Sequence, residues 1–493
     1  MVSILFLTEC MRNRIEKNVF TDLSLNLLFD CKILDTMSFI CNADEIIARQ
    51  DLFRALENKA FRNSLENLQS ILLTLSQKES AMRNAKSKCE EYFQYRLLAE
   101  EYINLLEFLS NIIVQPDCRF MIGLISYAKQ KSTIQAKLQE VLNEYIDTIN
   151  AISRFTTSVA TRITQVFPPN TPNTGLSVNN EIIDCARTLG LSILDLPRGF
   201  AKLRLTEDFS ESVMHIFSNE FKKLAILKQQ SESWIDLEII RLKDELDFYF
   251  SIFDFTFKVA REKKIDYSYP KVAAVPRYFA KKVYDVTLIA KGVNTIIPND
   301  ISFDQDENVF FLMGANGGGK TTYLRACAVN LILFLSGCPV FCESCAACSA
   351  EIYPFRAVFT HFPTSEGYET TGRLEEEASR VNAITQHTNE VIFIFFNESF
   401  SGANETLGEK LTFETAAKIK RSKAFALFVT HFSKYGFGSF PILNAVIDEK
   451  EGNKRTFRIQ RSSSREASHA NDILRKYGLD SLSLEQKRIS NNS

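Results

Sequence analysis

Residues 314–321 have the sequence Gly-Ala-Asn-Gly-Gly-Gly-Lys-Thr, and this stretch decides the fold of the second half of the chain. It matches the phosphate-loop pattern G-x-x-x-x-G-K-[ST]. An apolar run, Val309–Met313, precedes it, and a segment from Thr321 to Ser336 with an apolar face follows it. A glycine-rich loop between a strand and a helix is the context that the pattern requires. The sequence therefore predicts a nucleotide-binding α/β domain.

The residue types in this loop each suit the binding of a nucleotide. Glycines allow consecutive N–H groups to surround phosphate oxygens, and the start of the following helix adds partial positive charge. Lys320 is expected to reach the β- and γ-phosphates, and the Thr321 hydroxyl to ligate Mg²⁺. ATP and Mg²⁺ are thus the expected ligands. The predicted nucleotide-binding residues of the loop are Gly314, Ala315, Asn316, Gly317, Gly318, Gly319, Lys320, Thr321 and Thr322.

Two further strands are expected to complete this site. The apolar run Val391–Phe396 ends in Asn397 and Glu398. Glu398 is the candidate general base or water-orienting carboxylate, and Lys320 is assigned with it to catalysis. Asn397 is a candidate metal ligand, although an Asp usually occupies this position and an amide supplies no charge. His431 follows the run Ala424–Thr430 and is a third catalytic candidate, as a sensor of the γ-phosphate or of the attacking water.

The two halves of the chain differ in pattern. After about residue 290, short β-rich runs alternate with helices, which is typical of a mostly parallel sheet covered on both faces. Near the end, Ala445–Lys450 and Arg455–Gln460 predict a hairpin. Before residue 290, apolar residues recur every three to four positions, which predicts helices over 128–155, 208–228 and 234–257. The proline-rich stretch 167–175 predicts an exposed loop or a degenerate small insertion.

Bulk properties set limits on partners and compartment. The formal net charge is −2, so any contact with nucleic acid must come from local basic patches. Lys202 with Arg204, and Lys281 with Lys282, are such candidates. No secretory or membrane-spanning pattern is found, so we expect the chain to be cytoplasmic, and associated with the nucleoid if it is bacterial. The eleven cysteines are accordingly expected to be thiols.

One group of cysteines leaves an alternative open. Cys338, Cys342, Cys345 and Cys348 lie within eleven residues, which would allow zinc or an iron–sulfur cluster. The usual zinc site, however, joins two separated pairs of ligands. Their position after the helix that follows the glycine-rich loop also favours an ordinary place in the fold.

Taken together, these motifs resemble the MutS family of DNA mismatch-repair ATPases. The resemblance is carried by residues 314–325, the Thr-Thr-Gly-Arg-Leu-Glu-Glu-Glu stretch 370–377, Asn397-Glu398 and Thr430–Phe432. It covers roughly residues 290–480 and extends more faintly over the helical half. It implies an α/β P-loop ATPase domain of the ABC type with a mixed sheet, at 291–493. A mainly helical core and lever domain, at 1–290, is implied before it.

The resemblance also implies partners. Nucleotide sites in the family form between two ATPase domains, with a Ser/Thr loop reaching across, so Thr370 and Thr371 are expected binding residues in a homodimer. The segment from 462 to 477 is similar to the C-terminal dimerisation helices. The expected ligand is double-stranded DNA, with mismatched or branched forms left open.

The sequence also departs from the family pattern. The family loop has Pro and Met where this chain has Ala315 and Gly317. We expect no mismatch-reading domain, and a clamp shortened to about 155–205.

The leading functional hypothesis is an ATPase that couples ATP binding and hydrolysis to clamping on DNA, in repair or recombination. The alternative is a nucleotide-gated dimeric scaffold with little hydrolysis and no mismatch recognition, which the Asn397 substitution favours. A chromosome-organising or transporter-type ATPase is less consistent with the sequence. Its serine-glycine signature should precede the Glu398 strand, whereas Ser401-Gly402 follows it.

Overall fold

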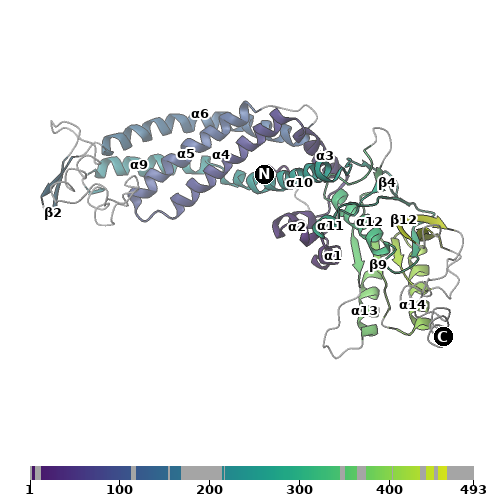
Figure 1. Cartoon of the computed structure of the whole chain (residues 1–493). Helices are drawn as coiled ribbons and strands as arrows, with labels where there is room; N and C mark the ends of the chain where they lie inside the picture. The colour runs from purple at the N-terminus through teal and green to yellow at the C-terminus, as the bar shows by residue number, and fades with distance from the viewer. Residues whose placement is uncertain are drawn as a thin grey trace, which may run out of the picture. The chain divides into compact units, whose positions relative to one another are not determined.

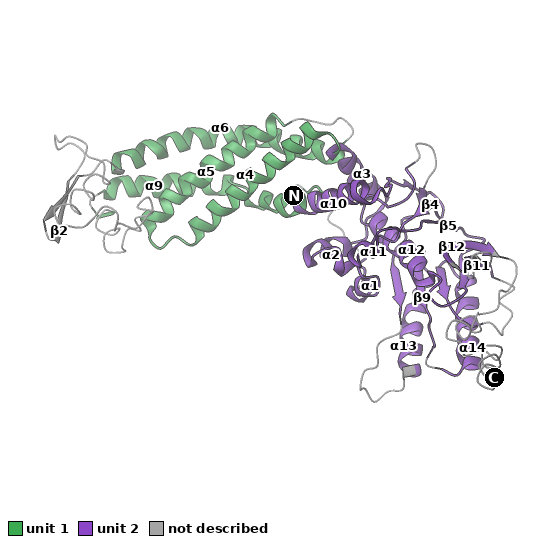
Figure 2. Ribbon diagram, viewed as in Figure 1, with its two compact units in different colours: residues 1–4, 57–246 green, residues 5–56, 247–493 purple. Residues whose placement is uncertain are grey.

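The computed structural model describes residues 3–5, 13–112, 118–153, 156–160, 162–167, 214–215, 217–344, 350–362, 373–401, 403–432, 440–448 and 454–462. The chain divides into two compact units (Figure 2). Unit 1 comprises Met1–Ile4 and Glu57–Leu246, and unit 2 comprises Leu5–Leu56 and Asp247–Ser493. This division does not coincide with the boundary proposed at residue 290, since residues 5–56 and 247–290 group with unit 2.

Unit 1 is built mainly of long helices, which Figure 1 shows running side by side. They are α4 (Lys59–Arg83), α5 (Lys88–Ser110), α6 (Arg119–Ser153) and α9 (Ser218–Ser231). α4 packs against α5, α5 against α6, and α9 against both α5 and α6. The helices predicted over 128–155 and 208–228 are confirmed as α6 and α9, although α6 begins earlier and α9 begins later than the pattern indicated.

Each of these helices buries one apolar stripe. On α5, Leu98, Tyr102, Leu105 and Leu109 follow one another at intervals of three or four residues and are all buried. This spacing puts them on one helix face, so that helix packing rather than intrinsic propensity supplies most of the stability. The helix starts are capped by short polar side chains: for α5, Ser87 Oγ accepts a hydrogen bond from the Glu90 N–H.

The helix predicted over 234–257 is wrong at its beginning. The structure has two short 3-10 helices, η4 (Glu232–Trp234) and η5 (Leu237–Arg241), and then α10 (Leu242–Lys263). Asp236 explains the break, because its side chain accepts a hydrogen bond from the Glu238 N–H and so starts a new helical segment. The same carboxylate accepts a hydrogen bond from the Tyr127 hydroxyl at 3.2 Å.

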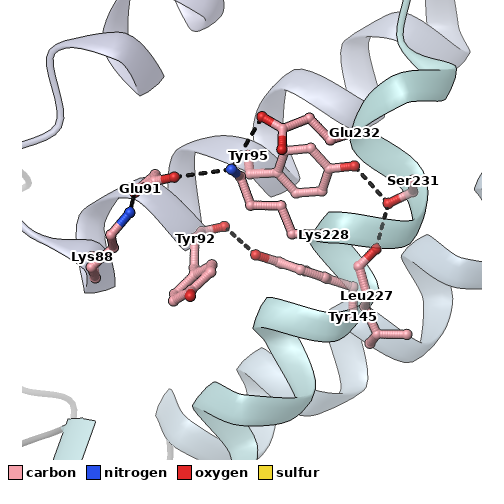
Figure 3. A network of polar contacts seen from close by, with 9 residues as sticks. All are labelled: Lys88, Glu91, Tyr92, Tyr95, Tyr145, Leu227, Lys228, Ser231 and Glu232. Carbon is pink, nitrogen blue, oxygen red and sulfur yellow. Dashed lines mark hydrogen bonds and ion pairs between the residues drawn. The ribbon is translucent and has the colours of Figure 1, made fainter.

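Polar groups link three helices of unit 1 (Figure 3). Lys228 on α9 donates to Glu91 on α5 at 2.9 Å and to Glu232 at 3.2 Å. The Tyr95 hydroxyl lies 2.6 Å from Ser231 Oγ, and the Tyr145 hydroxyl of α6 donates to the Tyr92 carbonyl at 2.9 Å. Burial raises the pKa of Tyr95 to about 12, so its hydroxyl stays protonated. These bonds fix the register of α5, α6 and α9.

Two short strands follow α6. They are β1 (Thr156–Ala160) and β2 (Arg162–Phe167), which pair antiparallel. They lie at the start of the region where we expected a shortened clamp. Residues 168–213, which hold most of that region together with Lys202 and Arg204, lie outside the described residues.

Unit 2 is built around a six-stranded sheet in the order β12-β11-β6-β10-β9-β8. The strands are β6 (Val309–Met313), β8 (Val358–His361), β9 (Phe393–Asn397), β10 (Phe425–Val429), β11 (Ile442–Asp448) and β12 (Lys454–Ser462). All neighbours are parallel except β11 and β12, which form the predicted hairpin with Ala445 opposite Ile459. The sheet is thus mixed, and the strands expected from the apolar runs are present within a few residues.

Both faces of this sheet are buried, which explains the uninterrupted apolar runs. On one face, Phe311, Phe396 and Phe428 pack with residues of α13 (Arg373–Thr385) and α14 (Glu405–Lys420). On the other face, Phe310 contacts Phe303 with ring centroids 4.6 Å apart, and Phe393 contacts Tyr278 at 6.0 Å. Alternate residues of one strand therefore enter two different cores.

A second sheet supplies the residues on that other face. It has the order β3-β7-β4-β5, with β3 (Lys271–Val272), β4 (Tyr278–Val283), β5 (Asn299–Phe303) and β7 (Ala350–Ile352). The helix after the glycine-rich loop, α12 (Lys320–Leu335), contacts β4 of this sheet and β9 and β10 of the larger one. The short helix α11 (Thr287–Ala290) precedes β5.

The N-terminal part of unit 2 packs on the end of α12. It forms α1 (Lys17–Asp22), η1 (Leu25–Leu27), α2 (Cys31–Ser38) and α3 (Ala43–Leu56). The Cys41 N–H donates to the Leu335 carbonyl at 2.9 Å. The fully buried Arg49 donates through Nη1 to the Ser336 carbonyl at 2.8 Å. These bonds use carbonyls that a helix terminus leaves without intrahelical partners. No helix among the described residues is long and apolar enough to cross a membrane.

Candidate functional site

The glycine-rich loop joins the carboxyl end of β6 to the start of α12. Gly314, Gly317 and Gly319 have φ values of 122°, 72° and 95°. These values lie in the left-handed region, which glycine enters without a Cβ clash. The Gly318 N–H donates to the Ala315 carbonyl at 3.0 Å, which closes a tight turn. The backbone is thus curled directly before a helix N-terminus, as a binding site for phosphate requires.

Lys320 is held inside this loop and is only 4% exposed. Its Nζ donates to the Gly314 carbonyl at 2.9 Å, and to the Ala315 carbonyl and Asn316 Oδ1 at 3.3 Å each. Burial lowers the pKa of the Lys320 ammonium, and the positive charge of Arg455 lowers it further, while the carboxylate of Glu398 raises it. The ammonium therefore lies within electrostatic reach of the end of β9.

Thr321 and Asn397 meet across the gap between α12 and β9. The Thr321 hydroxyl donates to Asn397 Oδ1 at 3.2 Å. Asn397 pairs in the sheet with Val429 of β10, which lies beside β6. Hydroxyl and amide oxygens are ligand types that Mg²⁺ accepts, although such sites usually also hold a carboxylate. The two predicted metal ligands are therefore adjacent, and the nearest carboxylate in sequence is Glu398.

Glu398 adopts an unusual backbone conformation. Its φ is 51°, and that of Phe400, two residues later, is 60°. The Glu398 N–H donates to the Val429 carbonyl at 2.9 Å, which anchors the turn to the neighbouring strand. Non-glycine residues with positive φ are costly and cluster at functional sites. The half-buried Glu398 side chain acts electrostatically on Lys320, so the two predicted catalytic residues share one site.

A pair that we did not predict supports this turn. His361 at the end of β8 is fully buried, and its Nδ1 lies 2.7 Å from Ser399 Oγ. Burial lowers the pKa of His361 to about 4, so the ring is neutral at pH 7. Its Nε2 has no hydrogen-bond partner among the described residues. The position of His361 after the short run Val358–Thr360 was the sequence signal, and it repeats the pattern that singled out His431.

Of the other predicted site residues, some lie in the described part of the chain and some lie outside it. His431 follows β10 and is exposed, with its ring centroid 4.5 Å from that of Phe432. Thr322 is half-buried in the first turn of α12. Thr370 and Thr371 lie outside the described residues, as does the predicted C-terminal helical segment from 463 onward.

Two of the four cysteines in the cluster lie among the described residues. Cys338 and Cys342 are free and buried, and burial raises the pKa of both thiols, that of Cys342 to about 11. Cys342 Sγ lies 3.2 Å from Ser268 Oγ. Cys345 and Cys348 lie outside the described residues, and no metal-binding group of side chains occurs among those described. Lys282, one of the basic candidates, is ion-paired with Glu343.

The region that holds these residues matches a known protein family. The family model for MutS domain V matches residues 310–440, which include the glycine-rich loop, β9 and β10. The chain is 20% identical to MutS protein homolog 4 of Mus musculus over 416 residues, which are 78% of this chain and 41% of that protein.

Two bacterial proteins match shorter stretches. Endonuclease MutS2 of Geobacillus thermodenitrificans is 25% identical over 198 residues, which are 39% of this chain and 25% of that protein. DNA mismatch repair protein MutS of Lactobacillus gasseri is 31% identical over 139 residues, which are 28% of this chain and 16% of that protein. The matches thus span less than half the length of each relative. The glycine-rich loop, the Asn397–Glu398 turn and these matches together support one conclusion: this chain is similar to the MutS family, with its domain V at residues 310–440.

Proposed function

We propose that this chain is a DNA-binding ATPase that couples ATP binding and hydrolysis to clamping on DNA, in repair or recombination. One observation carries the ATPase part: Lys320, Thr321, Asn397 and Glu398 meet at one edge of the sheet beside the glycine-rich loop. Carboxyl ends of parallel strands are where α/β proteins bind nucleotides. The relatives are named MutS protein homolog 4, Endonuclease MutS2 and DNA mismatch repair protein MutS, and these names support DNA as the partner.

Each side chain of the site has a task in such a reaction. The loop N–H groups and the start of α12 bind the polyphosphate, and Lys320 exchanges its carbonyl partners for phosphate oxygens. Thr321 and Asn397 would hold Mg²⁺, which would supply positive charge to stabilise the phosphates. Glu398 orients the attacking water and accepts its proton. The Ser399–His361 pair holds the Glu398 turn in place.

The DNA-binding part rests on the helical unit. The similarity to MutS protein homolog 4 covers 78% of the chain, so it must include much of the helical region as well as domain V. Clamping would be performed by the long helices of unit 1, with DNA held through backbone contacts and duplex shape. We also propose a homodimer through the ATPase domains, to which Thr370 and Thr371 would contribute.

The experiment uses the full chain and two lysine variants. Lys320→Ala should weaken ATP binding roughly 10- to 100-fold, because it removes a charged donor to phosphate. Lys410→Ala is the matched control, since Lys410 lies on the surface of α14 and pairs with Glu414. Unchanged ATP affinity in a folded Lys320→Ala protein would rule out the proposed site.

DNA binding is measured separately. The unmodified chain should bind homoduplex, mismatched or branched DNA in a gel shift that weakens steeply with salt, and its ATPase rate should respond to DNA. Hydrolysis without any gain in DNA affinity at low salt would leave an ATPase and remove the DNA part of the proposal.

A second candidate function follows from Asn397. Its side chain is neutral and accepts a hydrogen bond from the Thr321 hydroxyl, so the site has one negative charge fewer than a site with Asp. A nucleotide-gated dimeric scaffold would bind ATP but scarcely hydrolyse it. Asn397→Asp separates the two functions: a marked gain in turnover favours the scaffold, whereas no gain favours an ATPase adapted to Asn.

A further inference from the structure

The space next to Gly317 is occupied by the side chain of Arg455. A Cβ added at Gly317 would overlap Nη1 of Arg455 and lie 2.9 Å from its Cζ. The guanidinium thus lies where a side chain of residue 317 would begin. Gly317 has a φ of 72°, so the backbone there already favours glycine. The family pattern has Met at this position, and here glycine admits an arginine from another strand.

The sheet topology explains how Arg455 reaches the loop. β11 runs parallel to β6, so both strands end at the edge of the sheet where the glycine-rich loop begins. β12 pairs antiparallel with β11, and it starts one residue before Arg455. Ala445 of β11 packs against Gly314 in the same way. Arg455 is far from the loop in sequence. It lies beside the loop because of the order and register of β6, β11 and β12.

The strand that carries Arg455 is well anchored. Asn299 of β5 accepts a hydrogen bond from the Ile459 N–H at 2.7 Å and donates to the Phe457 carbonyl at 3.1 Å. The Thr456 hydroxyl donates to the Val446 carbonyl across the hairpin at 2.6 Å. The backbone that carries Arg455 is therefore held in place, so less main-chain entropy is lost when its side chain binds a ligand.

The charges around the loop favour an anion. Lys320 and Arg455 are both cationic, and the positive charge of Arg455 lowers the pKa of the Lys320 ammonium. Arg461 on the same strand is ion-paired with Glu307, whereas among the described residues no carboxylate pairs with Arg455. A guanidinium donates two parallel hydrogen bonds to phosphate, and a polyphosphate between the two cations would relieve their repulsion.

We propose that Arg455 is a second cationic ligand of the nucleotide polyphosphate, beside Lys320, and that Gly317 is required to admit its guanidinium. This proposal rests on the proposed nucleotide site. It assigns to β12 a part in recognising the charge of the phosphate chain, so nucleoside triphosphate binding should depend on Arg455 and nucleoside binding should not.

The test compares variants of Arg455 with a neighbour on the same strand. Arg455→Met keeps most of the length and removes the charge, and it should weaken ATP binding roughly tenfold, which corresponds to one charge-assisted hydrogen bond. Arg455→Lys should retain part of the affinity. Arg458→Met is the control, since Arg458 is exposed on β12 and is not among the nearest neighbours of the loop glycines. ATP affinity equal to the unmodified chain in Arg455→Met would overturn the proposal.

The failure of the nucleotide site itself has a different pattern. If neither Lys320→Ala nor Arg455→Met changes ATP affinity, the proposed function fails; if only Lys320→Ala does, the role of Arg455 fails. A double-mutant cycle supplies the second measurement. Gly317→Ala should weaken ATP binding less in the Arg455→Ala background than in the unmodified chain, because both substitutions disrupt the same contact. If the losses of ATP affinity from the two substitutions are additive, the contact between Gly317 and Arg455 does not contribute to ATP binding.

Discussion

In unit 1 polar side chains bond to one another across helices, whereas in unit 2 the lysine at the carboxyl edge of the sheet bonds to its own loop. Lys228 and Tyr95 find partners on neighbouring helices. Lys320 instead bonds to three oxygens of the loop that precedes it. Closed networks of the first kind stabilise a single packing arrangement. Groups of the second kind keep a capacity for other partners, which is typical of functional sites.

The backbone shows the same contrast. In unit 2 the turn after β9 holds Glu398 and Phe400 at positive φ, and the loop after β6 holds three glycines there. In unit 1, among the described residues, no residue has positive φ. Strain of this kind persists only where the surroundings enforce it. Substitutions at these two turns of unit 2 should therefore affect activity, whereas substitutions in the helix packing of unit 1 should affect stability.

The largest expected effect is on catalysis at the strained turn. Glu398→Gln removes the proposed base with little change of shape, so hydrolysis should fall roughly 10²- to 10⁴-fold while ATP binding persists. Steady-state turnover and equilibrium binding of ATP measure the two quantities. A turnover rate within a few-fold of the unmodified chain would remove Glu398 from the mechanism and weaken the contrast between the units.

In the helical unit we expect a substitution to lower stability and to leave ATP binding unchanged. Leu105→Ala on α5 removes a fully buried side chain and should lower the free energy of unfolding by about 2–5 kcal/mol. ATP affinity of the folded protein should not change. Leu97→Ala is the control on the same helix, because Leu97 is 38% exposed. Denaturant unfolding followed by circular dichroism measures both variants, and similar losses would contradict the helix packing described above.

The buried histidine of unit 2 predicts a pH dependence. The pKa of His361 is about 4 in the folded chain and about 6.5 when unfolded, so the unfolded state binds the extra proton between these values. Stability should thus fall as pH drops below 6.5, by up to about 3 kcal/mol at pH 4. His361→Asn should remove this component, and His387→Asn, at an exposed position, should leave it. Thermal unfolding from pH 7.5 to 4.5 makes the comparison.

The smallest effect concerns the ion pairs of unit 1. Burial raises the pKa of Glu91, but hydrogen bonds from Lys88 and Lys228 outweigh burial and hold it below the ordinary value. The stability from this group is therefore present above about pH 4.5 and is lost as pH falls through the lower folded value. At pH 7, Lys228→Met should lower stability by about 1 kcal/mol.

An exposed pair serves as the control for Lys228. Lys223→Met removes a 2.8 Å ion pair to Glu144 in which both side chains are about half exposed. It should lower stability by less than about 0.5 kcal/mol, because water screens such pairs. If the two lysine substitutions lower the free energy of unfolding equally, in low and in high salt, the partial burial of Lys228 adds nothing to the stability.

Much of the fold was predictable because its patterns are local. The run Val309–Met313 is β6 with the same bounds, and the helix expected from Thr321 is α12, which begins at Lys320. The hairpin near the end is β11 and β12. The prediction was wrong at Trp234, where the Asp236 side chain restarts the helix. An apolar period continues through such a restart, so periodicity does not reveal it.

The sequence by itself determined the chemistry of the loop, since the glycines, Lys320 and Thr321 are adjacent in the chain and their roles depend on local backbone geometry. It also indicated the alternation of strands and helices, because burial on two faces requires continuous apolar runs. Only the tertiary structure decided which distant residues join them. Arg455 meets Gly317 because the strand order β12-β11-β6 brings non-consecutive strands to one edge, and His361 meets Ser399 because β8 and β9 pair in parallel and end at that edge. Strand order and register arise from the packing of the whole sheet, and no short segment contains that information.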